Sequence, residues 1–330
     1  MKKLTVAIPN YNGGENLKRA INSCKKIFME KNEFEILIVD NCSTDNSIDI
    51  INTLKDEFSN IRLIQNKENV GRVENWNVSI DNAEGKFLIF LFSNDLVDED
   101  NNIDECVKIL EDDNTISIGF SSLRKKDFED SYKKKSFSEK IIKCKSKSFT
   151  NECLIRGLLP FGPIQSIIYR SDDIKKDGNK FRLDMPINAD EIFTYTEARK
   201  RDYILFNPSP QITWDLTKGR FHKQMKIEDE FEEHTKTIKM ISDSNNIEID
   251  YGLVSTYRVI NLLKFSTGNL KSSGKKDATM HLLSKMKESG SFFNTDKILF
   301  KTFFRKLTNS DKDADDILYS EIIKKCFKKS

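Results

Sequence analysis

Two stretches near the start of the chain decide the fold class: LTVAIPNYNGG, residues 4–14, and FEILIVDNCSTDNS, residues 34–47. Each begins with a run of apolar, often β-branched residues and ends in a group of small polar residues. Apolar residues at helical spacing follow each group, which predicts a buried strand, a polar turn and then a helix. Strands that alternate with helices in this way form a mainly parallel sheet, so the sequence predicts an α/β fold.

The same alternation continues to about residue 120, where IRLIQ (61–65) and KFLIFLF (86–92) predict a third and a fourth strand. After residue 121 the pattern changes, and the elements expected there are a loop or insertion at 124–147, a strand at 162–172, a helix around 189–201, a strand at 203–210 and a helical region from about residue 223.

Composition excludes several classes of protein. The 330 residues carry 54 Lys and Arg against 52 Asp and Glu, a net charge of +2, which argues against a protein built to bind nucleic acid. Mean hydropathy is −0.54, and no apolar run approaches the ~18 residues of a membrane helix. Six cysteines without a C-x-x-C pair and only three histidines argue against zinc, so a metal would depend on carboxylates. The short N-terminal apolar run predicts a strand rather than a signal peptide, and hence a cytoplasmic protein.

Polar clusters follow three of the predicted strands, at residues 9–12, 40–45 and 93–95. Ligands of doubly wound sheets bind outside the carboxyl ends of the strands, so these clusters predict one binding site. Helix capping is an equally good interpretation of Ser43, Thr44 and Asp45. The chain has neither G-x-G-x-x-G nor G-x-x-x-x-G-K-[ST], so a diphosphate bound here would need a divalent cation.

These motifs resemble those of family 2 glycosyltransferases. The resemblance rests on Pro9-x-Tyr11-Asn12, on VDNCSTD (39–45), on Asn69-x-Gly71-Arg72, and on AEGKF (83–87) before a strand that ends in Ser93-Asn94-Asp95. It implies a GT-A fold, with a catalytic domain at 1–222 that has a nucleotide-binding half at about 1–120 and an acceptor half at about 150–222. Residues 223–330 then form a helical C-terminal region.

The resemblance also implies a donor site. Its expected donor-binding residues are Pro9, Tyr11, Asn12, Asp40, Asn69, Gly71, Arg72, Ser93, Asn94 and Asp95. Asp40 matches the carboxylate that accepts a hydrogen bond from the base, and Asp95 matches the end of the metal motif, which implies Mn²⁺ or Mg²⁺. Phe92 and Asn94 stand where many relatives carry aspartates, so the expected metal site is weakened.

On the acceptor side, Gly178-x-x-Phe181 and the following NADE (188–191) resemble the segment that supplies the general base. Neighbouring residues of a helix face different ways, so only one acid can act. Asp190 is the expected base and Glu191 the runner-up; acids at a helix start that complement the helix dipole are the alternative. Arg220 and His222 match residues that reach the diphosphate, and His222 also the metal. A surface role is an equally good interpretation of His222.

The sequence thus predicts an inverting, metal-assisted transfer of a sugar from a nucleotide sugar, a UDP-sugar, to a glycan or lipid-linked glycan. The alternative is a catalytically weak relative that binds a nucleotide or glycan as an assembly partner. The basic, apolar stretch 292–307 could lie on an anionic membrane surface, so the protein could be peripheral on the inner face of the cell membrane. Packing against the catalytic domain, or against a second copy in a homo-oligomer, is the alternative for this stretch.

Overall fold

A computed structural model describes residues 2–30, 32–122, 124–126, 132–134, 140–155, 161, 163–215 and 227–249. The chain divides into two compact units. One comprises residues 1–146 and 161–220, and the other comprises residues 147–160 and 221–330. The predicted site residues that the structure describes all belong to the first unit.

The larger sheet of the first unit confirms the predicted α/β class. Its strand order is β3-β2-β1-β4-β10-β6-β11-β9. The first four strands, β1 (Leu4–Asn10), β2 (Phe34–Asp40), β3 (Ile61–Gln65) and β4 (Phe87–Phe90), are parallel, and β2 and β3 have their predicted bounds. Every residue of β2 is buried, as expected for a strand covered on both faces.

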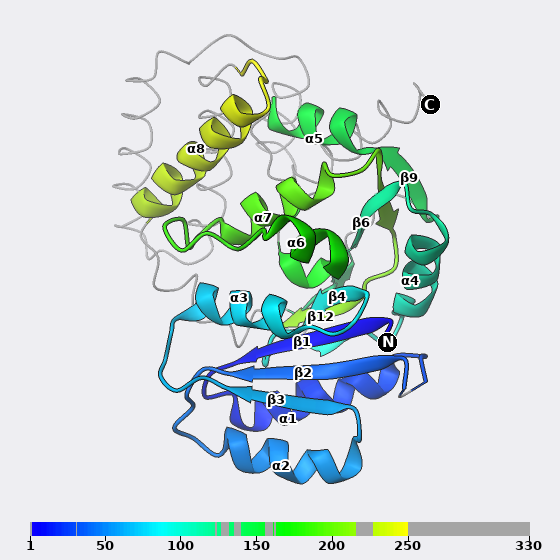
Figure 1. Ribbon diagram of the computed structural model, residues 1–330, viewed down its shortest axis with the longest axis vertical. Helices are drawn as coiled ribbons and strands as arrows, with labels where there is room; N and C mark the ends of the chain where they lie inside the picture. Colours follow the sequence, from blue (N-terminus) through cyan, green and yellow to red (C-terminus); the bar gives the residue numbers. More distant parts are fainter. Residues whose placement is uncertain are drawn as a thin grey trace. The chain divides into compact units, whose positions relative to one another are not determined.

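Helices cover both faces of this parallel part. The helices α1 (Gly14–Ser23) and α2 (Ser47–Glu57) pack against each other, whereas α3 (Arg72–Asn82) packs on β1 and β2. The strand order explains the arrangement: the chain moves outward from β1 to β3 and then returns past β1 to β4. Right-handed crossovers therefore place α3 on the opposite face from α1 and α2, as Figure 1 shows.

The remaining elements of the first unit extend the larger sheet and build a smaller one. Four further strands complete the larger sheet: β6 (Ile116–Ser121), β9 (Ile142–Lys145), β10 (Ile167–Arg170) and β11 (Tyr203–Asn207). The other helices of this unit are α4 (Ile103–Asp112), α6 (Ser171–Asp177) and α7 (Ala189–Ala198), with two short 3₁₀ helices, η1 (Cys24–Lys26) and η2 (Ile164–Ser166). The smaller sheet has the order β5-β12-β7-β8, from β5 (Leu96–Val97), β12 (Ile212–Asp215), β7 (Arg124–Lys126) and β8 (Tyr132–Lys134).

The predicted loop at 124–147 is wrong in part, because β7, β8 and β9 lie within it. β9 pairs antiparallel with β11 at the edge of the larger sheet. Its Cys144 is buried, while Lys143 and Lys145 on either side are exposed. Lysines are typical of edge strands, where they discourage pairing with another chain, so a Lys-rich composition does not exclude a strand.

The predicted strand at 162–172 is also too long. Only Ile167–Arg170 form β10, because Ser171 begins α6 with two acids, Asp172 and Asp173, in its first turn. Acids at that position favour a helix start. Gly178 ends α6 in a left-handed conformation with φ 63°, which glycine adopts without strain.

The described part of the second unit consists mainly of α5 (Ser146–Leu154) and α8 (Ile227–Ser244). α8 agrees with the helical pattern expected from about residue 223, and it buries Ile238 and Ile241. The stretch 292–307 lies outside the described residues. No helix in the described ranges is long and apolar enough to cross a membrane.

Candidate active site

Asp40 is the centre of a buried polar network at the carboxyl ends of β1 and β2. The parallel register pairs it with Asn10, whose Nδ2 donates to Asp40 Oδ1 at 2.8 Å. The Ser43 hydroxyl donates to the same oxygen at 2.6 Å, and the Ser43 backbone N–H donates to Oδ2 at 2.9 Å. Asp40 is only 1% exposed. A carboxylate accepts about four hydrogen bonds, so these three donors leave one acceptor position.

The loops after β1 and β2 lock together through Asn12. Its backbone N–H donates to Ser43 Oγ at 2.9 Å, and its Oδ1 accepts the Thr44 N–H at 2.8 Å. Asn12 and Cys42 both have left-handed backbones, with φ 53° and 62°. These contacts contradict the capping interpretation of Ser43 and Thr44, since Asn46 is the N-cap of α2. Asp45 agrees with that interpretation, because its Oδ1 accepts the N–H of Ser47, the first residue of α2, at 3.0 Å.

Gly13 permits a close approach between the same loop and the end of β4. A Cβ at this position would lie 2.3 Å from Asn10 Oδ1 and 3.1 Å from Ser93 Cβ. Ser47 Oγ also accepts the Gly13 and Gly14 N–H groups at 3.1 Å, which ties α1 to α2. Ser93 therefore lies at the same edge as Asn10 and Asp40. Pro9 is half-buried in β1, and Tyr11 is 50% exposed beside this edge.

Asn41 connects this edge to the loop after β3. Its Nδ2 donates to Asn69 Oδ1 at 2.8 Å, and its Oδ1 accepts the Val70 N–H at 2.9 Å. Asn69 Oδ1 also accepts the Gly71 N–H at 3.0 Å, and Gly71 has φ 86°. Asn69 and Gly71 thus shape the loop that leads to Arg72. Asn41 is not among the site residues predicted from the sequence, although its position directly after Asp40 is a usable signal.

Arg72 begins α3, and its side chain contacts Pro186 and Trp76. Its guanidinium donates to the Pro186 carbonyl, and its Cζ lies 4.8 Å from the centre of the Trp76 ring. Trp76 stacks on Phe92, with ring centroids 5.5 Å apart and planes at 22°. Phe92, at a position where the resemblance leads one to expect an aspartate, is therefore a packing residue.

Asp95 lies in a second buried network, and its partners come from distant parts of the chain. Gln165 Nε2 donates to Asp95 Oδ2 at 2.8 Å, and the Asp215 N–H donates to Oδ1 at 3.1 Å. Asn94 Nδ2 also donates to Oδ1 at 3.1 Å. Asp95 is completely buried, and this burial raises its pKa to about 7; the bonds from Gln165 and Asp215 oppose the shift, and the charge of Asp215 adds to it.

These surroundings do not fit the divalent cation that the resemblance implies. Both Asp95 oxygens face protein donors, and the Asn94 amide group is turned toward Asp95. Within the described part of the chain, no group of three or more His, Cys, Asp and Glu could hold a metal. The geometry therefore argues against the predicted metal role of Asp95. Arg220 and His222 lie outside the described residues, so their predicted roles remain predictions.

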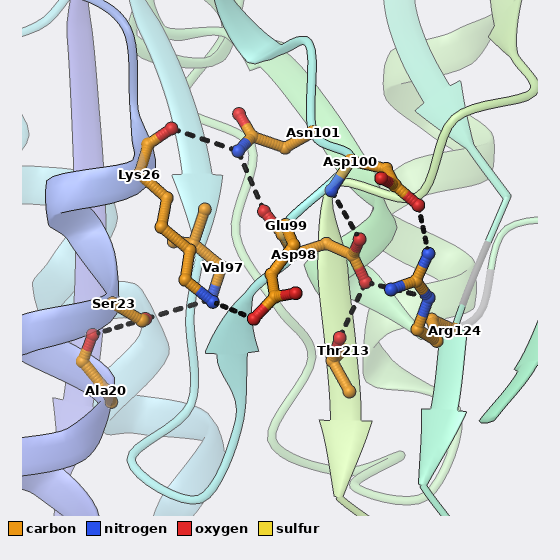
Figure 2. A network of polar contacts seen from close by, with 10 residues as sticks. All are labelled: Ala20, Ser23, Lys26, Val97, Asp98, Glu99, Asp100, Asn101, Arg124 and Thr213. Atoms are coloured by element: carbon orange, nitrogen blue, oxygen red, sulfur yellow. Dashed lines mark hydrogen bonds and ion pairs between the residues drawn. The ribbon is translucent and has the colours of Figure 1, made fainter. Parts of the chain in front are cut away.

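A third polar network binds β12, the strand whose last residue, Asp215, donates its backbone N–H to Asp95. Asp98 is buried and accepts the Thr213 hydroxyl at 2.6 Å, and Arg124 Nε lies 3.3 Å from Asp98 Oδ2 (Figure 2). Arg124 also pairs with Asp100. These contacts join β5, β7 and β12. The sequence gives no local signal for them, because the partners are up to 115 positions apart.

The two candidate bases differ in burial. Glu191 is buried, and its Oε2 accepts the Phe161 N–H at 3.1 Å. Asp190 is half-buried in the first turn of α7, and its Oδ1 accepts the Glu191 N–H at 3.0 Å. α7 packs on β6 and on η2, which contains Gln165, and the Arg72 contact with Pro186 lies four residues before Asp190. None of the contacts described joins Asp190 to the Asp40 network.

A mainly parallel sheet with polar loops at its carboxyl edge, joined to a smaller mixed sheet, defines the GT-A class of glycosyltransferase fold. The model of glycosyl transferase family 2 matches residues 5–178, more than half of the chain, and the chain belongs to this family.

Curated relatives are similar over somewhat less than a third of this chain. The poly(ribitol-phosphate) beta-N-acetylglucosaminyltransferase TarS of Staphylococcus aureus is 33% identical over 101 residues, which are 30% of this chain and 18% of TarS. The poly(ribitol-phosphate) beta-glucosyltransferase of Bacillus spizizenii is 32% identical over 96 residues, 29% of this chain and 15% of that enzyme. The similarity therefore spans less than a fifth of the length of these relatives.

Solved structures share the fold over a longer range. The crystal structure of S. aureus TarS 1-349 in complex with UDP-GlcNAc has a TM-score of 0.65 and 16% identity, with 97% of this chain and 90% of that chain covered. A mannosyltransferase from Pyrobaculum calidifontis, in complex with GDP-Man and Mn²⁺, has a TM-score of 0.52 and 13% identity, with 97% and 86% covered. At these identities the likeness is one of fold.

Proposed function

We propose that this chain transfers a sugar from a UDP-sugar to a hydroxyl of a surface glycan or lipid-linked glycan, with inversion at the anomeric carbon. The observation that carries the proposal is the Asp40 network. Two strand ends hold a buried carboxylate with one acceptor position left, at the sheet edge where α/β proteins bind ligands.

Asp40 suits a base that carries an N–H donor. Uracil has one such group at N3, and a hydrogen bond to a carboxylate is stronger than one between neutral groups. Tyr11 follows Asn10 directly at the end of β1, and its half-exposed ring is proposed to supply an apolar face for a base. The UDP and UDP-GlcNAc complexes of TarS, which has the same fold, support a uracil nucleotide.

Asp190 is the proposed general base. In the inverting step, the acceptor hydroxyl oxygen attacks the anomeric carbon from the side opposite the diphosphate. The bond from that carbon to the diphosphate oxygen breaks, and the hydroxyl proton passes to the Asp190 carboxylate. Glu191 is less suitable, because it is buried and binds the Phe161 backbone.

Mn²⁺ or Mg²⁺ remains the cofactor that the family resemblance implies. No step of the proposed transfer is assigned to it, because the donors around Asp95 do not fit a cation. The leaving diphosphate needs positive charge from the protein in either case. Arg72 is the described residue proposed for this role, and Arg220 and His222 are further candidates from the sequence.

The names of the relatives support an acceptor of the cell-surface type. TarS and the Bacillus enzyme are named for beta-linked transfer to poly(ribitol-phosphate), an anionic polyol polymer. Cytoplasmic location, membrane association through 292–307 and homo-oligomer formation stay predictions from the sequence.

The proposal is tested by measuring UDP release from a panel of UDP-sugars, with a polyol-phosphate polymer or a lipid-linked glycan as acceptor. Turnover that requires both donor and acceptor is expected. A catalytically weak relative is the second candidate, favoured by the packing role of Phe92. It would bind UDP, detected as a raised melting temperature, but release none from a UDP-sugar. A chain that binds no nucleotide would contradict both candidates.

A further inference from the structure

Trp76 joins a cation and an aromatic ring at the edge of the sheet. Arg72 and Trp76 are four residues apart on α3, which places them on one face of the helix. The Arg72 guanidinium lies 4.8 Å from the Trp76 ring, a favourable cation–π distance, and Phe92 stacks on the same indole at 5.5 Å. We call these three side chains the Arg72 stack.

The Arg72 stack lies close in the chain to the proposed nucleotide site. Arg72 follows Gly71, whose carbonyl accepts a hydrogen bond from Asn41 at 3.3 Å, and Asn41 follows Asp40 directly. Phe92 follows β4, next to Ser93, which lies beside Gly13. Both ends of the stack are therefore anchored to the loops that surround Asp40.

The Arg72 stack has an apolar ring at position 92, where many relatives have a negatively charged aspartate. An aspartate at position 92 would offer a ligand to a divalent cation, whereas Phe92 offers an apolar ring that supports Trp76. Asn94 and Asp95 are bonded to each other, and Asp95 is buried. Among the described residues, the cation that this packing holds in place is the Arg72 guanidinium, which can bind phosphate oxygens through two N–H groups.

We propose that the chain binds the diphosphate of its donor through Arg72, held by Trp76 and Phe92, and without a divalent cation at residues 93–95. This inference rests on the proposed function, because it presumes a nucleotide diphosphate at this edge. Phe92 and Trp76 are positioning residues in it, since they act through Arg72.

Calorimetric titration of the full chain with UDP, in EDTA and in Mn²⁺, tests the proposal. For the wild type we expect dissociation constants that agree within about twofold in the two buffers. Arg72→Met keeps a long side chain but loses the charge, and should weaken UDP binding about tenfold or more. Arg72→Lys should recover part of this loss. Arg182→Met, at another surface arginine, is the control and should bind as the wild type does.

A double-mutant cycle tests the positioning role. Phe92→Leu removes the ring that stacks on Trp76, and it should weaken UDP binding about two- to fivefold, within the worth of a stacked aromatic pair. Combined with Arg72→Met it should add nothing, because the guanidinium it positions is already gone. Thermal melts of each variant separate this coupling from general loss of stability.

Three results would overturn the proposal. Tenfold tighter UDP binding by the wild type in Mn²⁺ would show a cation in the donor site and leave the proposed function intact. Full additivity of Phe92→Leu and Arg72→Met would remove the positioning role. Absence of UDP binding in both buffers would overturn the proposed function together with this inference.

Discussion

Asp40 and Asp95 are both buried aspartates that follow strands of one sheet, yet their surroundings differ. Asp40 is bonded to Asn10 and to Ser43, and one acceptor position is left at the sheet edge. Asp95 is bonded to Asn94, Gln165 and Asp215, so it also has three donors and is as buried as Asp40. The two aspartates differ in where their partners come from: the Asp40 donors belong to two neighbouring strand ends at the sheet edge, whereas two of the three Asp95 donors come from distant segments. We therefore expect Asp40 to contact a ligand and Asp95 to hold elements together.

The two networks also differ in how far apart in the chain their members lie. The Asp40 network is built from two neighbouring parallel strands and the loops that follow them. The Asp95 network joins β4 to η2 and to the end of β12, which the Asp98 network of Figure 2 holds in place. Changes at Asp40 should therefore affect nucleotide binding, and changes at Asp95 should affect the assembly of the unit.

Neither of these aspartates is proposed to take the acceptor proton, so the largest effect on turnover is expected at a third carboxylate. Asp190→Asn keeps the size of the side chain but cannot accept a proton. General-base catalysis contributes ~10²–10⁴-fold, so kcat should fall by about that factor while UDP affinity changes little. Steady-state kinetics and calorimetry measure the two quantities.

Glu191→Gln is the matched control for this change. Its amide oxygen can still accept the Phe161 N–H, so both stability and turnover should stay close to those of the wild type. A large loss of turnover in Glu191→Gln, together with a small loss in Asp190→Asn, would make Glu191 the general base. Near wild-type turnover in both would remove α7 as the source of the base.

The next largest effect is expected for Asp40→Asn. Its contrast with Asp95→Asn directly tests the difference between the two aspartate networks. At position 40 an amide NH₂ would face the donors from Asn10 and Ser43. UDP affinity should fall about tenfold or more, with a loss of ~1–3 kcal/mol in the free energy of unfolding. At position 95 the amide can donate to Gln165 after that side chain turns over, so UDP affinity should stay within about twofold. Equal losses at both positions would show that Asp95 also contacts the donor.

The sequence predicted the local half of this architecture well. Hydrophobic periodicity and residue composition identified β1, β2 and β3. The polar residues at the ends of β2 and after β4 predicted that Asp40 and Ser93 lie at one edge of the sheet, because parallel strands end together. The sequence identified Asn69 and Gly71 as part of a loop motif. It did not predict that Asn69 Oδ1 accepts hydrogen bonds that shape the loop, or that Gly71 has a positive φ. Local pattern sufficed for β1, β2 and β3, which are successive in the chain and neighbours in the larger sheet.

Distant pairings were not predictable from the sequence. Gln165 and Asp215 reach Asp95 only after β10 and β12 have taken their places, and no local pattern encodes that pairing. The Lys-rich strands at 124–126, 132–134 and 142–145 are only three or four residues long and lack the apolar run of a buried strand. Two of them, β8 and β9, lie at sheet edges, and β7 lies between β12 and β8. The side chain of Phe92 was noted as a departure from the family motif, but its stacking on Trp76 required the structure.

The pH dependence of stability sharpens the comparison further. Burial raises the Asp95 pKa to about 7, well above its value in the unfolded chain. Between about pH 4 and pH 7 the folded protein therefore holds a proton that the unfolded chain has lost, and stability falls as the pH rises through this range. Below pH 4 both states are protonated, and above pH 7 the penalty is complete.

Asp95→Asn removes this titration. The free energy of unfolding of the wild type, minus that of the variant, should therefore decrease from pH 4 to pH 7 and level off above it. Urea melts of both proteins at several pH values measure the difference, in which other titrating groups cancel. A difference that stays constant over this range would mean that Asp95 is ionised in the folded protein throughout.

The smallest effect on UDP binding separates two glycines, Gly71 and Gly13. Gly71 has φ 86° and ψ 166°, a backbone region nearly confined to glycine, and a Cβ added there would meet nothing within 4 Å; Gly71→Ala therefore meets backbone strain alone, worth ~1–3 kcal/mol of stability.

Gly13→Ala has an ordinary φ of −82° but would bring its Cβ to 2.3 Å from Asn10 Oδ1, whose amide is held by Asp40. Because Asn10 cannot withdraw without losing that bond, Gly13→Ala should cost stability and should also weaken UDP binding. Chemical denaturation and calorimetry of the two variants measure both effects. A Gly13→Ala protein that binds UDP as the wild type does would show that Asn10 can move without disturbing Asp40, and would contradict the description of the Asp40 network as a rigid donor site.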